Sequence, residues 1–209
     1  METPSSAAAT AELARAAKQA KFALLAAVSK MSTLRPNMRT NCISATAIAA
    51  AILKRYDLPF RVVAGYTTTT GNTEARPHVW LHTPGLPAGD GITDLTGTDD
   101  RKETPMLGQY MFNAPDSARC TYWETDRVPE GYTEPAKTMP IAVLASHCAN
   151  FDMYFYRGTD ALRTARDEVL TYAYATATEK MSAASSAAAA AAYAAALAGA
   201  ANAAASGHP

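Results

Sequence analysis

The sequence predicts an α+β fold in which helices pack against an antiparallel sheet. Two helical segments come first, and extended segments separated by turn residues follow them. The sequence contains no internal repeat. The chain has 209 residues, of which 48% are hydrophobic, so it is long enough for one domain with its own core.

Charge and cysteine content narrow the class of protein. The 19 basic and 19 acidic side chains cancel, which argues against nucleic acid or an anionic membrane surface as the main partner. Cys42, Cys120 and Cys148 are too widely spaced for a disulfide framework or a C-x-x-C motif. Glu2 and Glu12 also argue against a secretory signal, so we expect a reducing, cytoplasmic location. We expect neither a metal nor a cofactor.

The first expected helix spans residues 5–31. Leu13, Leu24 and Met31 belong to an apolar stripe that recurs every three or four residues, as on one buried face of a helix. A polar connector that contains Pro36 follows this stripe. We expect this helix to dock on the rest of the domain.

The second expected helix begins around Asn41 and Cys42 and ends near Tyr56. The sequence Asp-Leu-Pro at 57–59 stops it, because proline cannot continue a helix. Ala45 belongs to the apolar stripe of this helix, and Cys42 lies three residues before it, on the same face. Cys42 is therefore expected in the first turn, on the inward face.

Three strands are expected next, at residues 60–67, 77–83 and 92–96. β-Branched and aromatic residues fill them, and turn residues separate them, with Gly71 in the first loop and prolines and glycines in the second. Such a succession is typical of an antiparallel meander.

The remainder of the chain is an irregular region and a C-terminal helix at 98–181, followed by an alanine-rich tail at 182–209. One more strand is expected near 120–123, and the helix is expected to start at a Thr159 and Asp160 cap. The tail is either a solvated helix or irregular, since alanine has high helix propensity but little apolar area to bury. The alanine-rich helices are candidates for docking on a partner or a second copy.

Cys42 is the candidate nucleophile. The first turn of a helix favours the thiolate through its unsatisfied N–H groups and its dipole. Cys120 falls in a strand-like context, and Cys148 falls in an apolar stretch where burial would raise the pKa of a thiol. The alternative for Cys42 is a small buried hydrophobic residue without chemistry.

His78 and Asp94 are the candidate base and orienting group. If the strands at 77–83 and 92–96 pair with an even sum of residue numbers, both side chains lie on one face, opposite or diagonal to each other. His82 shares this face and is the alternative base. His147 adjoins Cys148, but neighbouring side chains point apart in helices and strands, so this pair is interpreted as structural.

Four features in this order resemble the transglutaminase-like core of the papain-like cysteine enzymes. They are Asn-Cys at a helix start at 41–42, Leu-Pro-Phe-Arg-Val-Val-Ala-Gly-Tyr at 58–66, Pro-His-Val-Trp at 77–80 and Thr-Asp-Leu-Thr at 93–96. The resemblance covers residues 37–97. It implies a catalytic core at 37–97 within a single transglutaminase-like domain at 1–181.

The resemblance also implies a catalytic triad of Cys42 as nucleophile, His78 as general base and acid, and Asp94 as orienting residue. The oxyanion hole of this family combines the cysteine N–H with an upstream donor, which Asn37 or Asn41 would supply here. Asn41 is alternatively only the helix cap.

The expected function is therefore a cysteine hydrolase, a peptidase, amidase or deamidase that forms a thioester on a peptide or protein amide. Tyr66 and Trp80 are the expected walls of the substrate cleft, although Trp80 is alternatively a core residue. A second hypothesis keeps the triad and transfers the acyl group to an amine. A third hypothesis is a non-catalytic interaction module with the same fold.

Overall fold

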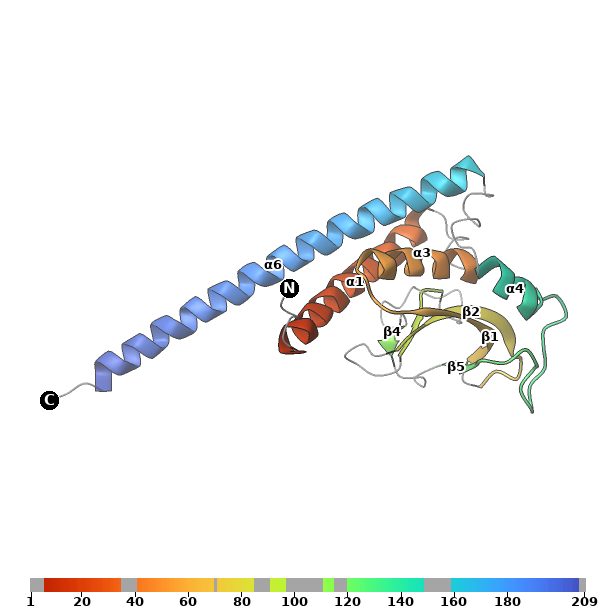
Figure 1. The fold of residues 1–209 in the computed structure, drawn as a ribbon, viewed down its shortest axis with the longest axis horizontal. Coiled ribbons are helices and arrows are strands. Elements are labelled where there is room, and N and C mark those ends of the chain that lie inside the picture. Colours follow the sequence, from red (N-terminus) through yellow and green to blue (C-terminus); the bar gives the residue numbers. More distant parts are fainter. Residues whose placement is uncertain are drawn as a thin grey trace.

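The computed structural model confirms the α+β class: helices cover one face of a five-stranded antiparallel sheet (Figure 1). It describes residues 6–34, 41–69, 71–84, 91–96, 111–114, 120–148 and 159–206. The strands lie in the order β4 (Met111–Ala114), β3 (Gly91–Asp94), β2 (Arg76–Thr83), β1 (Arg61–Thr69) and β5 (Cys120–Trp123).

The expected meander is confirmed by β1, β2 and β3, which pair in sequence order, and β5 adds to the free edge of β1. Two elements were not predicted: β4 and the helix α4 (Ile141–Cys148). β4 has only the residues Met-Phe-Asn-Ala, which do not alternate between apolar and polar. α4 is eight residues long and mostly apolar, and periodicity alone does not separate such a run from a strand.

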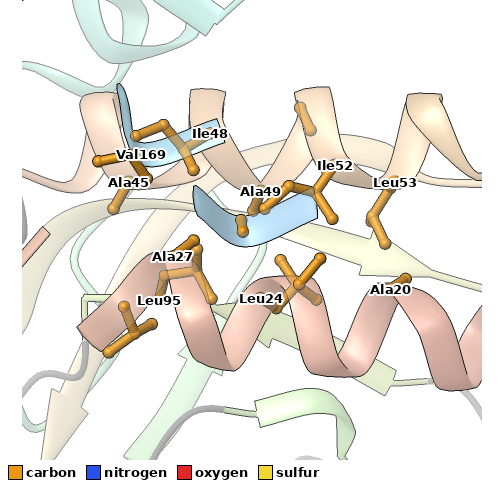
Figure 2. Close-up of a cluster of buried hydrophobic side chains, with 14 of the residues drawn as sticks. Ala20, Leu24, Ala27, Ala45, Ile48, Ala49, Ile52, Leu53, Leu95 and Val169 are labelled. Carbon is orange, nitrogen blue, oxygen red and sulfur yellow. The ribbon is translucent and has the colours of Figure 1, made fainter. Parts of the chain in front are cut away.

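Helix α1 (Ser6–Leu34) lies side by side with α6 (Asp160–Ser206), as the red and blue ribbons of Figure 1 show. The predicted stripe of the first helix is confirmed, since Leu24, Val28 and Met31 are buried. In Figure 2, Leu24 and Ala27 of α1 face the buried side chains of the next helix, α3 (Cys42–Arg55). The main core therefore lies between the helices, above the sheet.

Helix α3 starts and stops where the sequence predicts. The Asn41 side chain caps it by accepting hydrogen bonds from the N–H groups of Ile43 (3.0 Å) and Ser44 (3.2 Å). At the other end, Tyr56 is the C-cap and Asp57 takes a left-handed φ of 53°. Helix α3 is buried on more than the one face that the predicted stripe covers, because α1 packs against one side of it and β2 against the other.

Helix α6 begins at the predicted cap, where the N–H of Leu162 donates to the Thr159 hydroxyl. It then runs without a break to Ser206, so the tail is helical as far as this residue. Its first half is packed; among the side chains described, which reach residue 196, Ala177 is the last buried one and those at 185–196 are exposed. None of the described helices is both long and apolar enough to cross a membrane.

Candidate active site

Cys42 is the first residue of α3, in the helical turn where the sequence places it. Its thiol is free and half-buried, and it packs against a cluster of Ile43, Val79 and Leu144. The Asn41 cap fixes the helix start, and so it holds the thiol beside the positive end of the helix dipole.

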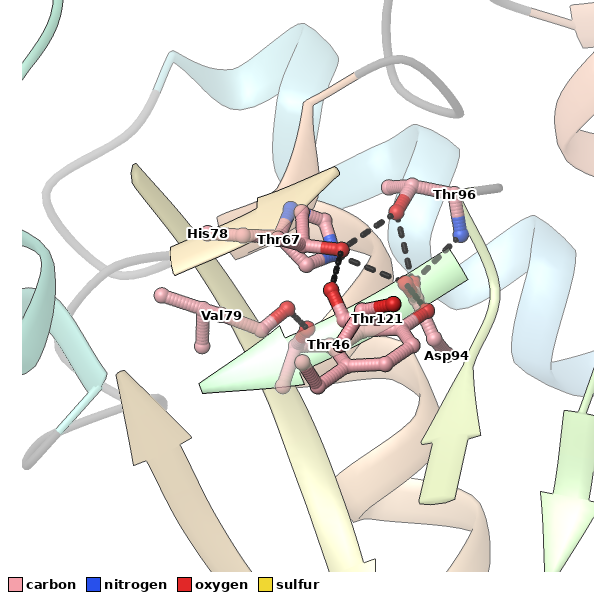
Figure 3. A network of polar contacts seen from close by, with 8 residues as sticks. Thr46, Thr67, His78, Val79, Asp94, Thr96 and Thr121 are labelled. Carbon is pink, nitrogen blue, oxygen red and sulfur yellow. Dashed lines mark hydrogen bonds and ion pairs between the residues drawn. The ribbon is translucent and has the colours of Figure 1, made fainter. Parts of the chain in front are cut away.

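A buried hydrogen bond fastens the beginning of α3 to β2. The Thr46 hydroxyl, one turn after Cys42, donates to the carbonyl oxygen of Val79 across 2.9 Å (Figure 3). Val79 adjoins His78, and an electrostatic interaction with the Cys42 thiol contributes to the raised pKa of His78. Since the His78 Nε2 atom is engaged with Asp94, Nδ1 is the ring nitrogen left for the thiol.

His78 and Asp94 form a buried pair, with 2.7 Å between His78 Nε2 and Asp94 Oδ2. β2 and β3 pair with Leu81 opposite Thr93, so the sum of partner numbers is even, as the shared face requires. His78 is 7% exposed and Asp94 is 2% exposed. The register therefore brings together the two side chains that the sequence singles out.

Further donors hold the Asp94 carboxylate through both of its oxygens. Oδ1 accepts from the backbone N–H of Thr96 (2.9 Å) and from the Thr96 hydroxyl (2.6 Å). Oδ2 accepts from the Tyr122 hydroxyl (2.8 Å) in addition to His78. Figure 3 shows the Thr96 bonds converging on Asp94 beside the His78 ring. A buried carboxylate with so many donors stays ionised.

The two partners change each other's protonation. Burial alone lowers the pKa of His78, but the Asp94 charge, the hydrogen bond to Asp94 and the interaction with Cys42 raise this pKa to about 10. Burial alone raises the pKa of Asp94, but the His78 charge and the Thr96 donors lower it to about 2. The pair is consequently an imidazolium and a carboxylate through the neutral range of pH.

Sequence reasoning missed Thr96 and Tyr122 as parts of this site. Thr96 follows Asp94 by two positions, and such a local side-chain turn is a signal that could have indicated it. Tyr122 lies on β5, which pairs with β1 and not with β3, so no local pattern connects it to Asp94.

The alternative base, His82, lies elsewhere on the same strand. It pairs with Ile92 of β3, and its Nδ1 atom is buried with no hydrogen-bond partner in the described part of the chain. The Asp94 carboxylate binds His78 instead. The geometry therefore favours His78 as the base.

Both residues expected to line the substrate cleft are buried aromatic side chains. Trp80 is 3% exposed and stacks on His78, with 6.2 Å between ring centroids. Tyr66 is 5% exposed, and its hydroxyl donates to Glu134 across 3.0 Å. Contact of either residue with a substrate stays a prediction.

Of the two oxyanion candidates, only Asn41 belongs to the described residues; Asn37 lies outside them. The Asn41 side-chain oxygen serves as the helix cap, which leaves its amide N–H groups to donate elsewhere. No acceptor among the described residues binds the backbone N–H of Cys42. The oxyanion role of both asparagines stays a prediction.

Comparison with known proteins adds no relative to this description. No protein family model matches the sequence, and neither a curated protein nor a solved structure is significantly similar to the chain. Across the described ranges, no three His, Cys, Asp or Glu side chains are grouped as ligands of a metal ion. The chemistry of the site is therefore inferred from its geometry.

Proposed function

We propose that the chain is a thiol-dependent amide hydrolase, a peptidase, amidase or deamidase, with Cys42 as nucleophile. The supporting observation is that the Nε2 atom of buried His78 lies 2.7 Å from Asp94 Oδ2, while Cys42, which begins a helix, contributes to the raised pKa of His78. Thiol catalysis requires a nucleophile next to a base, and a carboxylate that orients the base.

The first chemical step uses the thiolate and the imidazolium. The Cys42 sulfur forms a bond to the amide carbon, and the tetrahedral oxyanion accepts hydrogen bonds from the helix start, where the Cys42 N–H is one donor. The carbon–nitrogen bond then breaks as His78 gives its proton to the leaving amine. The products of this step are a thioester on Cys42 and a free amine.

The second step returns the enzyme to its starting state. Neutral His78 takes a proton from water, and the resulting hydroxide attacks the thioester carbon. The carbon–sulfur bond breaks, so that Cys42 leaves as a thiolate beside protonated His78. The overall reaction is an amide plus water to a carboxylic acid plus an amine.

We further propose that the core is transglutaminase-like. A cysteine at the start of a helix, a histidine on β2 and an aspartate at the end of β3 follow in chain order, and β1, β2 and β3 form a meander. This order supports the likeness together with the sequence motifs. Because a thiol nucleophile needs reducing conditions, the cytoplasm is the proposed location.

A peptide library tests the proposed function. We expect the wild-type chain to release new peptide termini or ammonia, detected by mass spectrometry, and Cys42→Ala to release none. Thr33→Ala is the matched control, since its exposed hydroxyl on α1 donates to the Lys30 carbonyl oxygen of the same helix. A biotin-linked primary amine added to the reaction distinguishes hydrolysis from acyl transfer, because its incorporation into peptides would favour transfer. Release that persists in Cys42→Ala would contradict the proposal.

A further inference from the structure

Tyr122 shares an oxygen of Asp94 with His78. Its hydroxyl donates to Oδ2 across 2.8 Å, and His78 Nε2 lies 2.7 Å from the same atom. The ring is 8% exposed and packs edge-on against Trp80, with 5.0 Å between ring centroids. Tyr122 is thus fixed by its ring as well as by its hydroxyl.

We propose that Tyr122 is a positioning residue of this site that takes up part of the Asp94 charge, so that protonated His78 can release its proton to the leaving amine. The inference rests on the function proposed above, and it assigns a role to a residue for which the sequence motifs give none.

The division of donors on Asp94 supports an electrostatic role for the Tyr122 hydroxyl. Thr96 donates twice to Oδ1, so the carboxylate remains oriented without Tyr122. The hydroxyl therefore changes how much negative charge Oδ2 presents to His78. Hydrogen bonds to a charged acceptor are stronger than those between neutral groups, so Tyr122 takes up a substantial part of the charge on Oδ2.

A smaller charge on Oδ2 helps the acid step. An imidazolium that faces an unshared carboxylate holds its proton tightly, and a general acid works best when its pKa lies near the working pH. Among the described residues, the titratable groups that interact with the His78 ring are Asp94 from β3, Cys42 from α3 and Tyr122 from β5. Of these, Tyr122 alone is a neutral donor that competes for Oδ2.

Nuclear magnetic resonance titration of the His78 ring tests the inference. In Tyr122→Phe we expect the pKa of His78 to rise by about half a unit or more, because His78 becomes the sole donor to Oδ2 among the described side chains. Tyr174→Phe is the matched control, since it removes a tyrosine hydroxyl that bonds to the Ala51 carbonyl oxygen between helices. A ring-fluorinated tyrosine at position 122, a stronger donor, should lower the pKa of His78 and does not depend on whether Tyr122→Phe folds.

The results separate this inference from the proposed function. If the pKa of His78 is unchanged or falls in Tyr122→Phe while wild-type Cys42 shows reactivity that depends on His78, only the role of Tyr122 is overturned. If wild-type Cys42 shows no such reactivity, the proposed function is overturned, and the inference with it.

Discussion

Asp94 Oδ2 lies 2.7 Å from His78 Nε2, although the two residues are sixteen positions apart along the chain. They meet because the register of β2 and β3 places both side chains on one face of the sheet. Neither side chain reaches bulk water to any useful extent. The pair is charged and buried, and removal of one partner from such a pair is costly. Its electrostatics therefore govern both the stability and the chemistry that we expect of this site.

Asp94→Asn should reverse the effect of the carboxylate on His78. Without the charge, burial dominates, and we expect the pKa of His78 to fall from about 10 to 6.5 or below. Amide hydrolysis should fall on the order of 100-fold or more, because the general acid and base is then neutral and poorly oriented. Titration of the His78 ring measures the first effect. Asp167→Asn on the exposed side of α6 is the control and should change neither quantity.

The pH dependence of unfolding reports the same pair. His78 has a raised pKa, so its ionisation contributes fully to the free energy of unfolding below pH 6.5. This contribution is lost as the pH rises toward about 10. Asp94 has a lowered pKa, so its contribution is complete above pH 3.8 and is lost as the pH falls toward about 2. Urea denaturation across the alkaline range should show a declining free energy of unfolding, with a smaller decline in Asp94→Asn. Parallel curves for the two proteins would argue against the raised pKa.

Gly65→Ala should destabilise the sheet next to the site. Gly65 pairs with His78, and a Cβ atom there would lie 2.1 Å from the Trp123 carbonyl oxygen and 2.9 Å from the Trp80 ring. We expect a loss of about 1–3 kcal/mol or more, measured by urea denaturation. Gly71→Ala is the control: its Cβ would meet no atom within 4 Å, so only the cost of its positive φ remains. Equal losses in the two variants would show that close packing at Gly65 is unimportant.

Truncation after Met181 should leave the folded body intact. The removed part of α6 lies beyond Ala177, the last buried residue among the side chains described for this helix, and it carries exposed side chains at 185–196. We expect the free energy of unfolding to change by less than about 0.5 kcal/mol. Sedimentation of the full chain and of the truncated chain tests whether the tail holds copies together. An unchanged oligomeric state would remove the docking role considered for the alanine-rich tail.

Local chemistry explains what the sequence could predict. The start of α3 follows from the capping ability of Asn41, and the end follows from Pro59, so the position of Cys42 depends on residues close to it. The pairing of His78 with Asp94 follows from strand periodicity once β2 and β3 form a hairpin. Only the choice between even and odd register needed the structure.

The parts that were not predictable depend on distant contacts. Tyr122 reaches Asp94 from the opposite side of β1, through a strand pairing that no turn sequence encodes. Leu144 packs near Cys42 because α4 crosses β1 and β2, although its short apolar sequence does not by itself distinguish a helix from a strand. Such contacts come from tertiary packing, and propensity does not determine them.

The reactivity of Cys42 tests the central claim most directly. Alkylation of the folded protein should be measured at each cysteine by mass spectrometry over a range of pH, for wild type and for His78→Ala. We expect rapid modification of Cys42 that persists well below the free-thiol pKa of about 8.5 and is diminished in His78→Ala. Cys42 that stays unreactive until the protein unfolds, or that reacts equally in both proteins, would contradict the thiolate and imidazolium pair.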